Sequence, residues 1–384
     1  MKARRVITAV SVIVVVLAIV NFYIGWHIWQ LIRDWWPNVP ANLFWPLFAL
    51  IVFAYLIGSI PWPKPLRPLA KFLKVTGSYY FAVMLFALIL LPIVDLVYWI
   101  LRQTGVTTPT YYVSIAGGIL LGLISILLIW GSRNAWSTVV RSHSIHIEKK
   151  VADLSQLRIA VASDLHLGNI VGRRHLKRMV ARINAMEPDL ILLPGDVLDD
   201  SIEPFIRNQM SEILQELKAK YGVFAVLGNH EYYGGAIERY VGLMGRVGIR
   251  VLQDEIVEVA QAYYVVGRKD RAAESLDLEG RRSIASLLEE LDISRPVIVI
   301  DHQPSEFDLA AKSGVDLLLC GHTHRGQIAP GHWMTKRLFE LDWGYLRKGQ
   351  LHVVVSSGYG TWGPPIRLAS RSEIVELLVK FGEK

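Results

Sequence analysis

The sequence predicts a membrane protein of two parts: an N-terminal region of four transmembrane helices and a C-terminal α/β domain with a mixed sheet. Three observations carry this prediction. Four apolar runs of transmembrane length follow one another in the first third of the chain. From Leu157 onward, short apolar runs rich in β-branched residues alternate with amphipathic helical patterns. The segment "DEIVEVAQAYYVVG" has the pattern of a hairpin, which adds an antiparallel pair to buried, parallel-type strands.

The four apolar runs are each close to the ~20 residues that cross the core of a bilayer. Of the 384 residues, 52% are hydrophobic, which is high for a wholly soluble protein. Tryptophan and tyrosine gather at the ends of the runs, as in the aromatic belts of membrane helices. Buried helices of a soluble protein are the alternative, but four such runs joined by short loops favour membrane spans. The runs cover residues 6–32, 43–60, 79–101 and 111–132.

Lysine and arginine residues orient these spans. Basic clusters precede the first run, separate the second from the third and follow the fourth, whereas the other two loops carry one basic residue each, Arg33 and Arg102. By the positive-inside rule, we expect a multi-pass protein of the cell membrane with both termini and the C-terminal domain in the cytoplasm. Residues 1–132 hold nine basic and two acidic residues and so account for the whole net charge of +7. The charge therefore reflects membrane topology, and we expect no nucleic-acid partner.

The predicted domain boundaries follow these patterns. Residues 1–132 form the transmembrane region, 133–156 a juxtamembrane linker with one strand, and 157–384 the α/β domain. In the linker strand, His143 and His146 are expected to face solvent. The single cysteine, Cys320, excludes an internal disulfide framework, suits a reducing cytosol, and is expected to be a small buried residue at a strand end. Asp95 is the only acidic residue within a span, so transport through the spans is a minor alternative function.

Six apolar runs predict the strands of the α/β domain: "LRIAVAS", "DLILLPG", "GVFAVLG", "RPVIVID", "VDLLLCG" and "LHVVVSSG". Helical patterns lie between several of them, at residues 173–185, 204–218, 235–247 and 278–291. The polar segment "RKDRAAESLDLEG" predicts a flexible loop.

Polar side chains follow five of these strands at the point where each strand ends. Ligands of open α/β sheets bind at the carboxyl ends of strands, so we expect these side chains to meet. Imidazole, carboxylate and amide oxygen together suit manganese, iron or zinc. Seven such ligands are too many for one tetrahedral ion but suit two ions about 3.5–4 Å apart, the usual arrangement for phosphoryl hydrolysis. In strand order the seven are Asp164 and His166; Asp196; Asn229; His302; and His322 with His324, and His230 follows Asn229 directly.

Five motifs in this order, "SDLHLG", "GDVLD", "GNHEYY", "DHQP" and "GHTHRGQ", resemble the calcineurin-like metallophosphoesterases. The resemblance covers roughly residues 157–380. "SSGYGTWGPPIRL" followed by "EIVEL" is similar to the end of the branch that includes membrane-linked bacterial phosphoesterases. The resemblance implies a two-sheet β-sandwich flanked by helices, with a catalytic domain over residues 157–384.

The resemblance also implies a role for each residue at the strand ends. Asp164, His166 and His324 would hold a first divalent metal. Asn229, His302 and His322 would hold a second. Asp196 would bridge both ions. His230 would be the catalytic histidine that stabilises or protonates the leaving group. Two cations lower the pKa of a water between them and neutralise phosphoryl oxygens.

Two positions near the motifs raise structural questions. His322 and His324 are one residue apart and would point to opposite sides of an extended chain. We expect a sharp turn at the strand end, permitted by Gly321, to aim both rings at neighbouring metals. Arg367 in "GPPIRL" contacts either a substrate phosphate or an internal carboxylate.

Together these observations predict a membrane-anchored binuclear metallophosphoesterase. It would hydrolyse a phosphodiester, pyrophosphate or phosphomonoester bond at the cytoplasmic membrane face. Its partners would be the lipid bilayer and a phosphorylated, lipid-linked or soluble, substrate; the oligomeric state is left open. The alternative is a non-enzymatic membrane adaptor built on the same fold.

Overall fold

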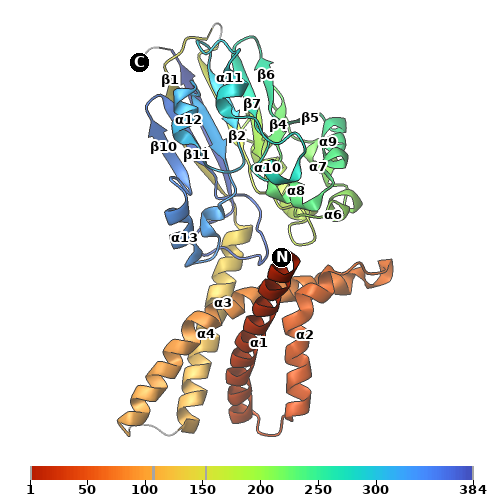
Figure 1. The fold of residues 1–384 in the computed structure, drawn as a ribbon, viewed down its shortest axis with the longest axis vertical. Coiled ribbons are helices and arrows are strands. Elements are labelled where there is room, and N and C mark those ends of the chain that lie inside the picture. The colour runs from red at the N-terminus through yellow and green to blue at the C-terminus, as the bar shows by residue number, and fades with distance from the viewer. Residues whose placement is uncertain (1, 106–108, 152–153, 383–384) are drawn as a thin grey trace. The chain divides into compact units, whose positions relative to one another are not determined.

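The computed structural model describes residues 2–105, 109–151 and 154–382 of the chain (Figure 1). The chain divides into two compact units. The helical unit comprises residues 1–130 and 363–365, and the α/β unit comprises residues 131–362 and 366–384. The boundary near residue 130 therefore lies inside a continuous helix, α4 (Pro109–Trp136).

The helical unit contains the predicted spans. Within the described residues, four helices are long and apolar enough to cross a membrane, which confirms the four predicted runs. The third helix is longer than predicted, because it begins at Arg67 and not at residue 79. Pro68 is tolerated in its first turn, where the missing amide hydrogen needs no partner. The helices are α1 (Lys2–Trp35), α2 (Ala41–Ser59), α3 (Arg67–Gln103), which follows the short turn η1 (Lys64–Leu66), and α4.

Glycines allow α2 and α3 to pack closely. A Cβ atom on Gly77 would lie 2.1 Å from the backbone nitrogen of Tyr55, and one on Gly58 would lie 2.3 Å from that of Lys74. Small residues at such contacts are the usual means by which membrane helices associate.

The carboxylate of Asp95 on α3 has partners on α1. The Tyr23 hydroxyl donates a hydrogen bond to it, and His27 Nε2 lies 3.4 Å from Asp95 Oδ2. Asp95 thus links the first and third helices of the unit.

The α/β unit is a two-sheet sandwich, as predicted. Its described residues form two six-stranded sheets, in the orders β1-β12-β2-β3-β4-β5 and β10-β11-β9-β8-β7-β6. The first sheet contains β1 (Val139–Ile147), β12 (Glu373–Phe381), β2 (Gln156–Val161), β3 (Leu190–Pro194), β4 (Val223–Val226) and β5 (Ile249–Leu252). The second contains β10 (Gly344–Lys348), β11 (Leu351–Val355), β9 (Leu317–Cys320), β8 (Val297–Ile300), β7 (Tyr263–Gly267) and β6 (Glu255–Val259).

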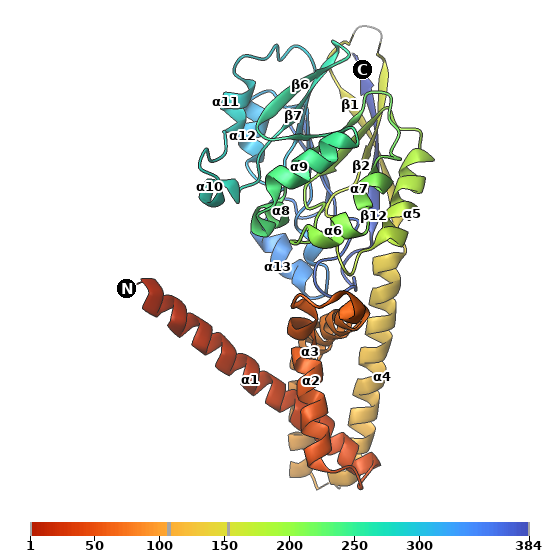
Figure 2. The same ribbon diagram turned by 90° about the vertical axis from the view of Figure 1, so that its right-hand side faces the viewer.

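The core of the sandwich explains the continuous apolar strand sequences. Inward side chains such as Ile159 and Leu190 of the first sheet meet Ile298 and Leu317 of the second. Helices α5 (Arg173–Asn184), α7 (Met210–Leu214) and α9 (Ile237–Arg246) contribute to the core on the other face of the first sheet. Helices α11 (Ile284–Leu288) and α12 (Phe307–Lys312) pack on the second sheet. Figure 2 shows α5 and α7 on one side of the unit and α11 and α12 on the other. Strands covered on both faces have no polar face to present.

Parallel pairing brings the polar strand ends together. β2, β3 and β4 run parallel, as do β7, β8 and β9. The carboxyl ends of neighbouring strands therefore lie at one edge of each sheet. His302, just after β8, donates from Nδ1 to the carbonyl oxygen of Pro194 at the end of β3, at 2.8 Å. This hydrogen bond joins the two edges.

The strand predicted in the linker belongs to the first sheet. β1 pairs in parallel with β12, and its Ile145 and Ile147 are buried in the core between the sheets. His143 and His146 on this strand are half-buried, so the prediction that they face solvent is only partly right. Cys320 is buried at the end of β9, where burial raises the pKa of its thiol, as expected of a packing residue.

Two helical predictions were too long. The pattern at 204–218 forms α6 (Glu203–Arg207) and α7, which are separated where Gln209 adopts a left-handed backbone conformation (φ 49°). The pattern at 278–291 forms only α11. Amphipathic periodicity shows which residues face the core, but it does not show where the backbone interrupts a helix.

The predicted flexible loop is instead an ordered, partly buried segment. It contains the short helix α10 (Ala273–Leu276), and Arg268, Lys269 and Asp270 are almost fully buried. Arg268 forms an ion pair of 2.9 Å with buried Asp301, and Gln303 donates to Asp270 at 3.1 Å. The prediction was wrong because these charged side chains find partners inside the fold.

Candidate metal centre

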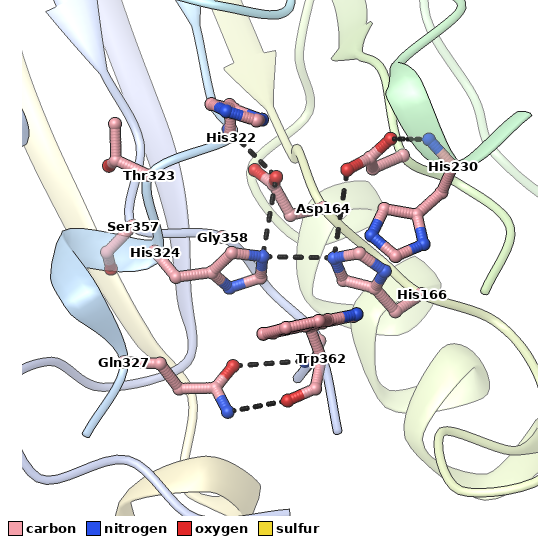
Figure 3. Close-up of polar contacts among 12 residues, drawn as sticks. Asp164, His166, His230, His322, Thr323, His324, Gln327, Ser357, Gly358 and Trp362 are labelled. Carbon is pink, nitrogen blue, oxygen red and sulfur yellow. Dashed lines mark hydrogen bonds and ion pairs between the residues drawn. The ribbon is translucent and has the colours of Figure 1, made fainter. Parts of the chain in front are cut away.

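Seven predicted ligand residues converge at the carboxyl edges of the two sheets. Asp164 and His166 follow β2, and Asp196 follows β3. Asn229 begins α8 (Asn229–Gly234), three residues after the end of β4. His302 follows β8, and His322 and His324 follow β9. Figure 3 shows Asp164, His166 and His324 pointing toward one another, with the His322 backbone bonded to Asp164.

The first group consists of Asp164, His166 and His324, whose ligand atoms all lie within 4.8 Å of one another. The Nε2 atoms of His166 and His324 are 2.9 Å apart. His324 Nε2 lies 3.6 Å from Asp164 Oδ1.

The second group consists of Asp196, His302 and His322, again within 4.8 Å. His302 Nε2 lies 3.1 Å from Asp196 Oδ2 and 3.2 Å from Asn229 Oδ1. Asp196 Oδ2 also lies 3.9 Å from His166 Nε2 of the first group. Asp196 is thus the residue that approaches both groups.

These donors fit divalent cations. Asp164 is fully buried, and among the described residues its Oδ2 atom and the Nδ1 atom of His166 have no hydrogen-bond partner. The carbonyl of Pro194 can only accept, so His302 carries a proton on Nδ1 and, when neutral, presents the Nε2 lone pair to the group. Burial lowers the pKa of His166 to about 3 and that of His322 to about 4. Neutral imidazoles are the metal-binding form.

The ligand loops carry strained backbone. Asp164, His166, Asp196, His322 and His324 all have positive φ, from 45° to 71°. Such conformations are uncommon for residues with side chains and cost of order 1–3 kcal/mol each. They occur here at five of the seven predicted ligands, which marks the edge as a functional site.

The turn after β9 differs from the expectation in one respect. The histidines themselves take the left-handed conformations that redirect the chain. Gly321 serves for close approach, because a Cβ atom there would lie 2.3 Å from Asp164 Oδ2.

Comparison with known proteins agrees with this geometry. The model of the calcineurin-like phosphoesterase family matches residues 157–326. A metallophosphoesterase of Aquifex aeolicus is 34% identical over 245 residues, which cover 63% of this chain and 91% of that protein. The chain belongs to the calcineurin-like phosphoesterase family. A Campylobacter jejuni metallophosphoesterase is 32% identical over 74% of this chain and 76% of its own length.

A further relative is named as a transmembrane protein. A zebrafish protein, "Transmembrane protein with metallophosphoesterase domain", is 30% identical over 269 residues. The match covers 67% of this chain and 61% of the zebrafish protein. The chain is therefore a metal-dependent phosphoesterase with membrane-linked homologues.

Sequence reasoning missed Glu231, which ties the phosphoesterase loops together. Its buried carboxylate accepts hydrogen bonds from the backbone amides of Asp196 (3.1 Å), Leu198 (2.7 Å) and Gly228 (2.7 Å). These amides belong to the loops that follow β3 and β4. The signal was present in "GNHEYY", because a glutamate three residues after a helix N-cap commonly bonds back to it.

His230 lies beside the two groups and has its own acidic partner. Its ring centre is 4.7 Å from that of His166, and its Nδ1 forms an ion pair of 2.7 Å with Asp200. Burial opposes the imidazolium, but Asp200 and Asp196 outweigh it and raise the pKa of His230 to about 9. His166, Asp199 and His230 also form a third group of possible ligand atoms, so geometry alone leaves a metal-binding role for His230 open.

Arg367 supports the site from behind. It is fully buried and donates to the carbonyl oxygens of Ser357 (2.7 Å) and Gly360 (3.1 Å). Its Nη2 lies 3.1 Å from His324 Nδ1. Among the described residues, Arg367 makes neither predicted contact: its side chain is buried away from solvent, and its hydrogen bonds go to carbonyls, a hydroxyl and this imidazole.

Two exposed aromatic rings flank His230. Tyr233 and Trp362 are 65% and 57% exposed, with ring centres 6.2 and 6.3 Å from that of His230. Gln327 holds the Trp362 backbone through two hydrogen bonds, accepting from its amide (3.0 Å) and donating to its carbonyl (2.8 Å) (Figure 3). The last residue of "GHTHRGQ" thus positions an aromatic side chain next to the site.

We predict that Glu231→Gln weakens metal binding by roughly 10- to 100-fold, the range for lost partners that orient metal-site loops. The glutamine keeps one acceptor oxygen, and its amide nitrogen turns donor hydrogens toward the backbone amides that the other carboxylate oxygen served. Competition with a chelator measures the affinity. Glu203→Gln, an exposed glutamate of α6, is the matched control. Equal affinities in the two variants would contradict the role of Glu231.

Proposed function

We propose that this phosphoesterase is a membrane-anchored binuclear enzyme that hydrolyses a phosphodiester, pyrophosphate or phosphomonoester at the cytoplasmic face of the cell membrane. The observation that carries the binuclear proposal is the position of Asp196, 3.1 Å from His302 and 3.9 Å from His166. One carboxylate near both groups suits a bridging ligand.

In this proposal each group of ligands holds one cation, manganese, iron or zinc. Asp164, His166 and His324 hold the first, Asn229, His302 and His322 the second, and Asp196 contacts both. When bound, the ions supply Lewis acidity toward the phosphoryl oxygens and an activated water nucleophile at neutral pH.

The protein's own contribution is to position the phosphate and supply a proton. Asp200 occupies Nδ1 of His230, so Nε2 is the ring nitrogen that donates. Donation from Nε2 to the departing oxygen avoids release of an alkoxide. Asp200 holds the ring in place during this transfer.

Two features support a lipid-linked or otherwise amphipathic substrate. The backbone nitrogen of Arg367 donates to the carbonyl oxygen of Gly131 (2.9 Å), and Gly131 follows directly on the last residue of the helical unit. Arg367 in turn reaches the ligand His324. Tyr233 and Trp362 add exposed apolar surface beside the histidine that faces the leaving group.

Removal of the bridging carboxylate tests the binuclear site. We predict that Asp196→Ala loses most bound metal and essentially all turnover of an aryl phosphodiester. Asp292→Ala, which removes an exposed carboxylate of the same unit, should keep both. Metal analysis of the detergent-purified protein decides between them. Two metals and near-normal turnover in Asp196→Ala would contradict the assignment, and an inactive but fully metallated parent protein would favour the adaptor alternative.

Leaving-group dependence tests the role of His230. We predict that His230→Ala keeps both metals and loses roughly 10²–10⁴-fold in kcat, the range for a lost general acid. The loss should be larger for an alkyl ester than for a nitrophenyl ester, because a nitrophenolate departs without a proton. His143→Ala, on β1, is the matched control. Equal losses on both esters would remove the proton-donor role, and loss of a metal would make His230 a ligand.

Cysteine labelling of intact cells tests the orientation. Basic residues flanking the spans predict that the loop between α1 and α2 lies outside and the α/β unit inside. In a Cys320→Ala background, an impermeant maleimide should label Asn38→Cys and leave Ser275→Cys unlabelled; both parent residues are exposed. The reverse pattern would overturn the topology.

A further inference from the structure

Helix α13 (Gly331–Leu338) presents an apolar surface that the described residues of the protein leave uncovered. Trp333, Met334 and Leu338 are 67%, 63% and 71% exposed. Lys336 and Arg337 are exposed on the same helix, whose sequence contains no acidic residue. The helix combines large apolar side chains with positive charge.

Contacts with the metal-ligand loop hold α13 in place. The amide of Gly331 donates to the carbonyl of Ile328 at 2.8 Å. Asp342 joins the helix to the ligand loop, because its carboxylate accepts from Thr335 (2.7 Å) and its carbonyl accepts from Thr323. The apolar residues are thus displayed by an anchored helix next to the site.

The same loop is hydrogen-bonded to the segment that also contacts the end of α4. The amide of Leu368 donates to the carbonyl of Gln327 (2.9 Å), four residues before α13 begins. The neighbouring residue, Arg367, binds Gly131 at the end of the span. Within the α/β unit, α13 and the end of α4 therefore lie on the same side.

We propose that α13 lies in the headgroup region of the bilayer that its own four spans cross. Trp333, Met334 and Leu338 enter the boundary with the acyl chains, as the apolar faces of interfacial helices do to a depth of about 5–10 Å. Lys336 and Arg337 bind anionic lipid headgroups. This surface deepens the proposed function and rests on it: it seats the mouth of the metal site against the bilayer, where a lipid-linked phosphate ester is presented.

A second copy of the chain fits this surface less well. One eight-residue helix offers much less area than a stable dimer interface buries. A two-fold contact through α13 would also bring Lys336 and Arg337 of both copies together with no acidic residue of the helix between them. An anionic bilayer complements the charge instead.

Spin labels on the full chain in vesicles test the proposal. Native Cys320 is 1% exposed and is replaced by alanine. Single labels at Trp333→Cys and Leu338→Cys are compared with one at Leu278→Cys, an exposed leucine on a different loop of the same unit. In vesicles of phosphatidylcholine and phosphatidylglycerol, oxygen should relax the labels at 333 and 338 more than a water-soluble nickel complex does. The order should reverse at 278.

The lipid composition of the vesicles tests the role of the two basic residues. Lys336→Ala with Arg337→Ala should move the label at 338 toward water in the anionic vesicles and leave it unchanged in pure phosphatidylcholine. An identical shift in both vesicles would overturn the role of anionic lipid charge.

Two results would contradict the insertion of α13 into the bilayer. The first is equal access of the nickel complex to all three labels. Dipolar coupling between labels at 338 of two chains, without exposure to oxygen, would assign the surface to a second copy. Depth is measured without turnover, so failure here leaves the catalytic proposal standing. An inserted α13 in a protein without phosphoesterase activity would contradict the catalytic proposal alone.

Discussion

The structure depends on holding five predicted ligand residues in left-handed backbone conformations at the edges of two sheets. Asp164, His166, Asp196, His322 and His324 would each relax to a more common conformation if their loops were free. Buried carboxylates prevent this. Glu231 fixes the loops after β3 and β4 through three amide hydrogens, and Asp164 accepts the amide of His322 at 2.8 Å. The sandwich core supplies the stability against which this strain is set, because its inner strands, such as β3, β4, β8 and β9, are covered on both faces.

The electrostatics of the edge follow from the same crowding. Burial raises the pKa of Asp164 to about 6, with nearby Asp196 adding to the effect. Burial also opposes a charge on His302, yet the Asp196 carboxylate outweighs it and raises the pKa of that imidazole. A proton on His302 thus compensates carboxylate charge that a divalent cation would otherwise compensate. The site thus favours a positive charge at its centre, and the predicted ligands around that charge come from the loops of both sheets.

Much of this site could be predicted from the sequence, because strand ends and ligand chemistry are both local patterns. The apolar runs located the strands, and the polar residues directly after them located the seven predicted ligands and His230, which the structure brings together. The supporting residues could not be found in this way. Arg367 lies 43 residues from His324 along the chain, and its guanidinium is recognisable as a support only once both are placed. The buried charges of Arg268 and Asp270 gave a polar pattern that resembles a loop, since composition does not show which charges are paired inside.

The end of α4 is an integral part of the phosphoesterase fold rather than a linker to it. The Asn134 side chain donates to the backbone carbonyl of Arg367 (3.1 Å), and the backbone carbonyl of Asn134 accepts from the amide of Ser372, which precedes β12. β1 then pairs along the whole of β12, the strand that also borders β2. A chain cut at the predicted boundary near Leu157 would lose β1 and the hydrogen bonds that place Arg367 behind His324. The end of α4 and the predicted ligand His324 therefore belong to one hydrogen-bonded network within the α/β unit.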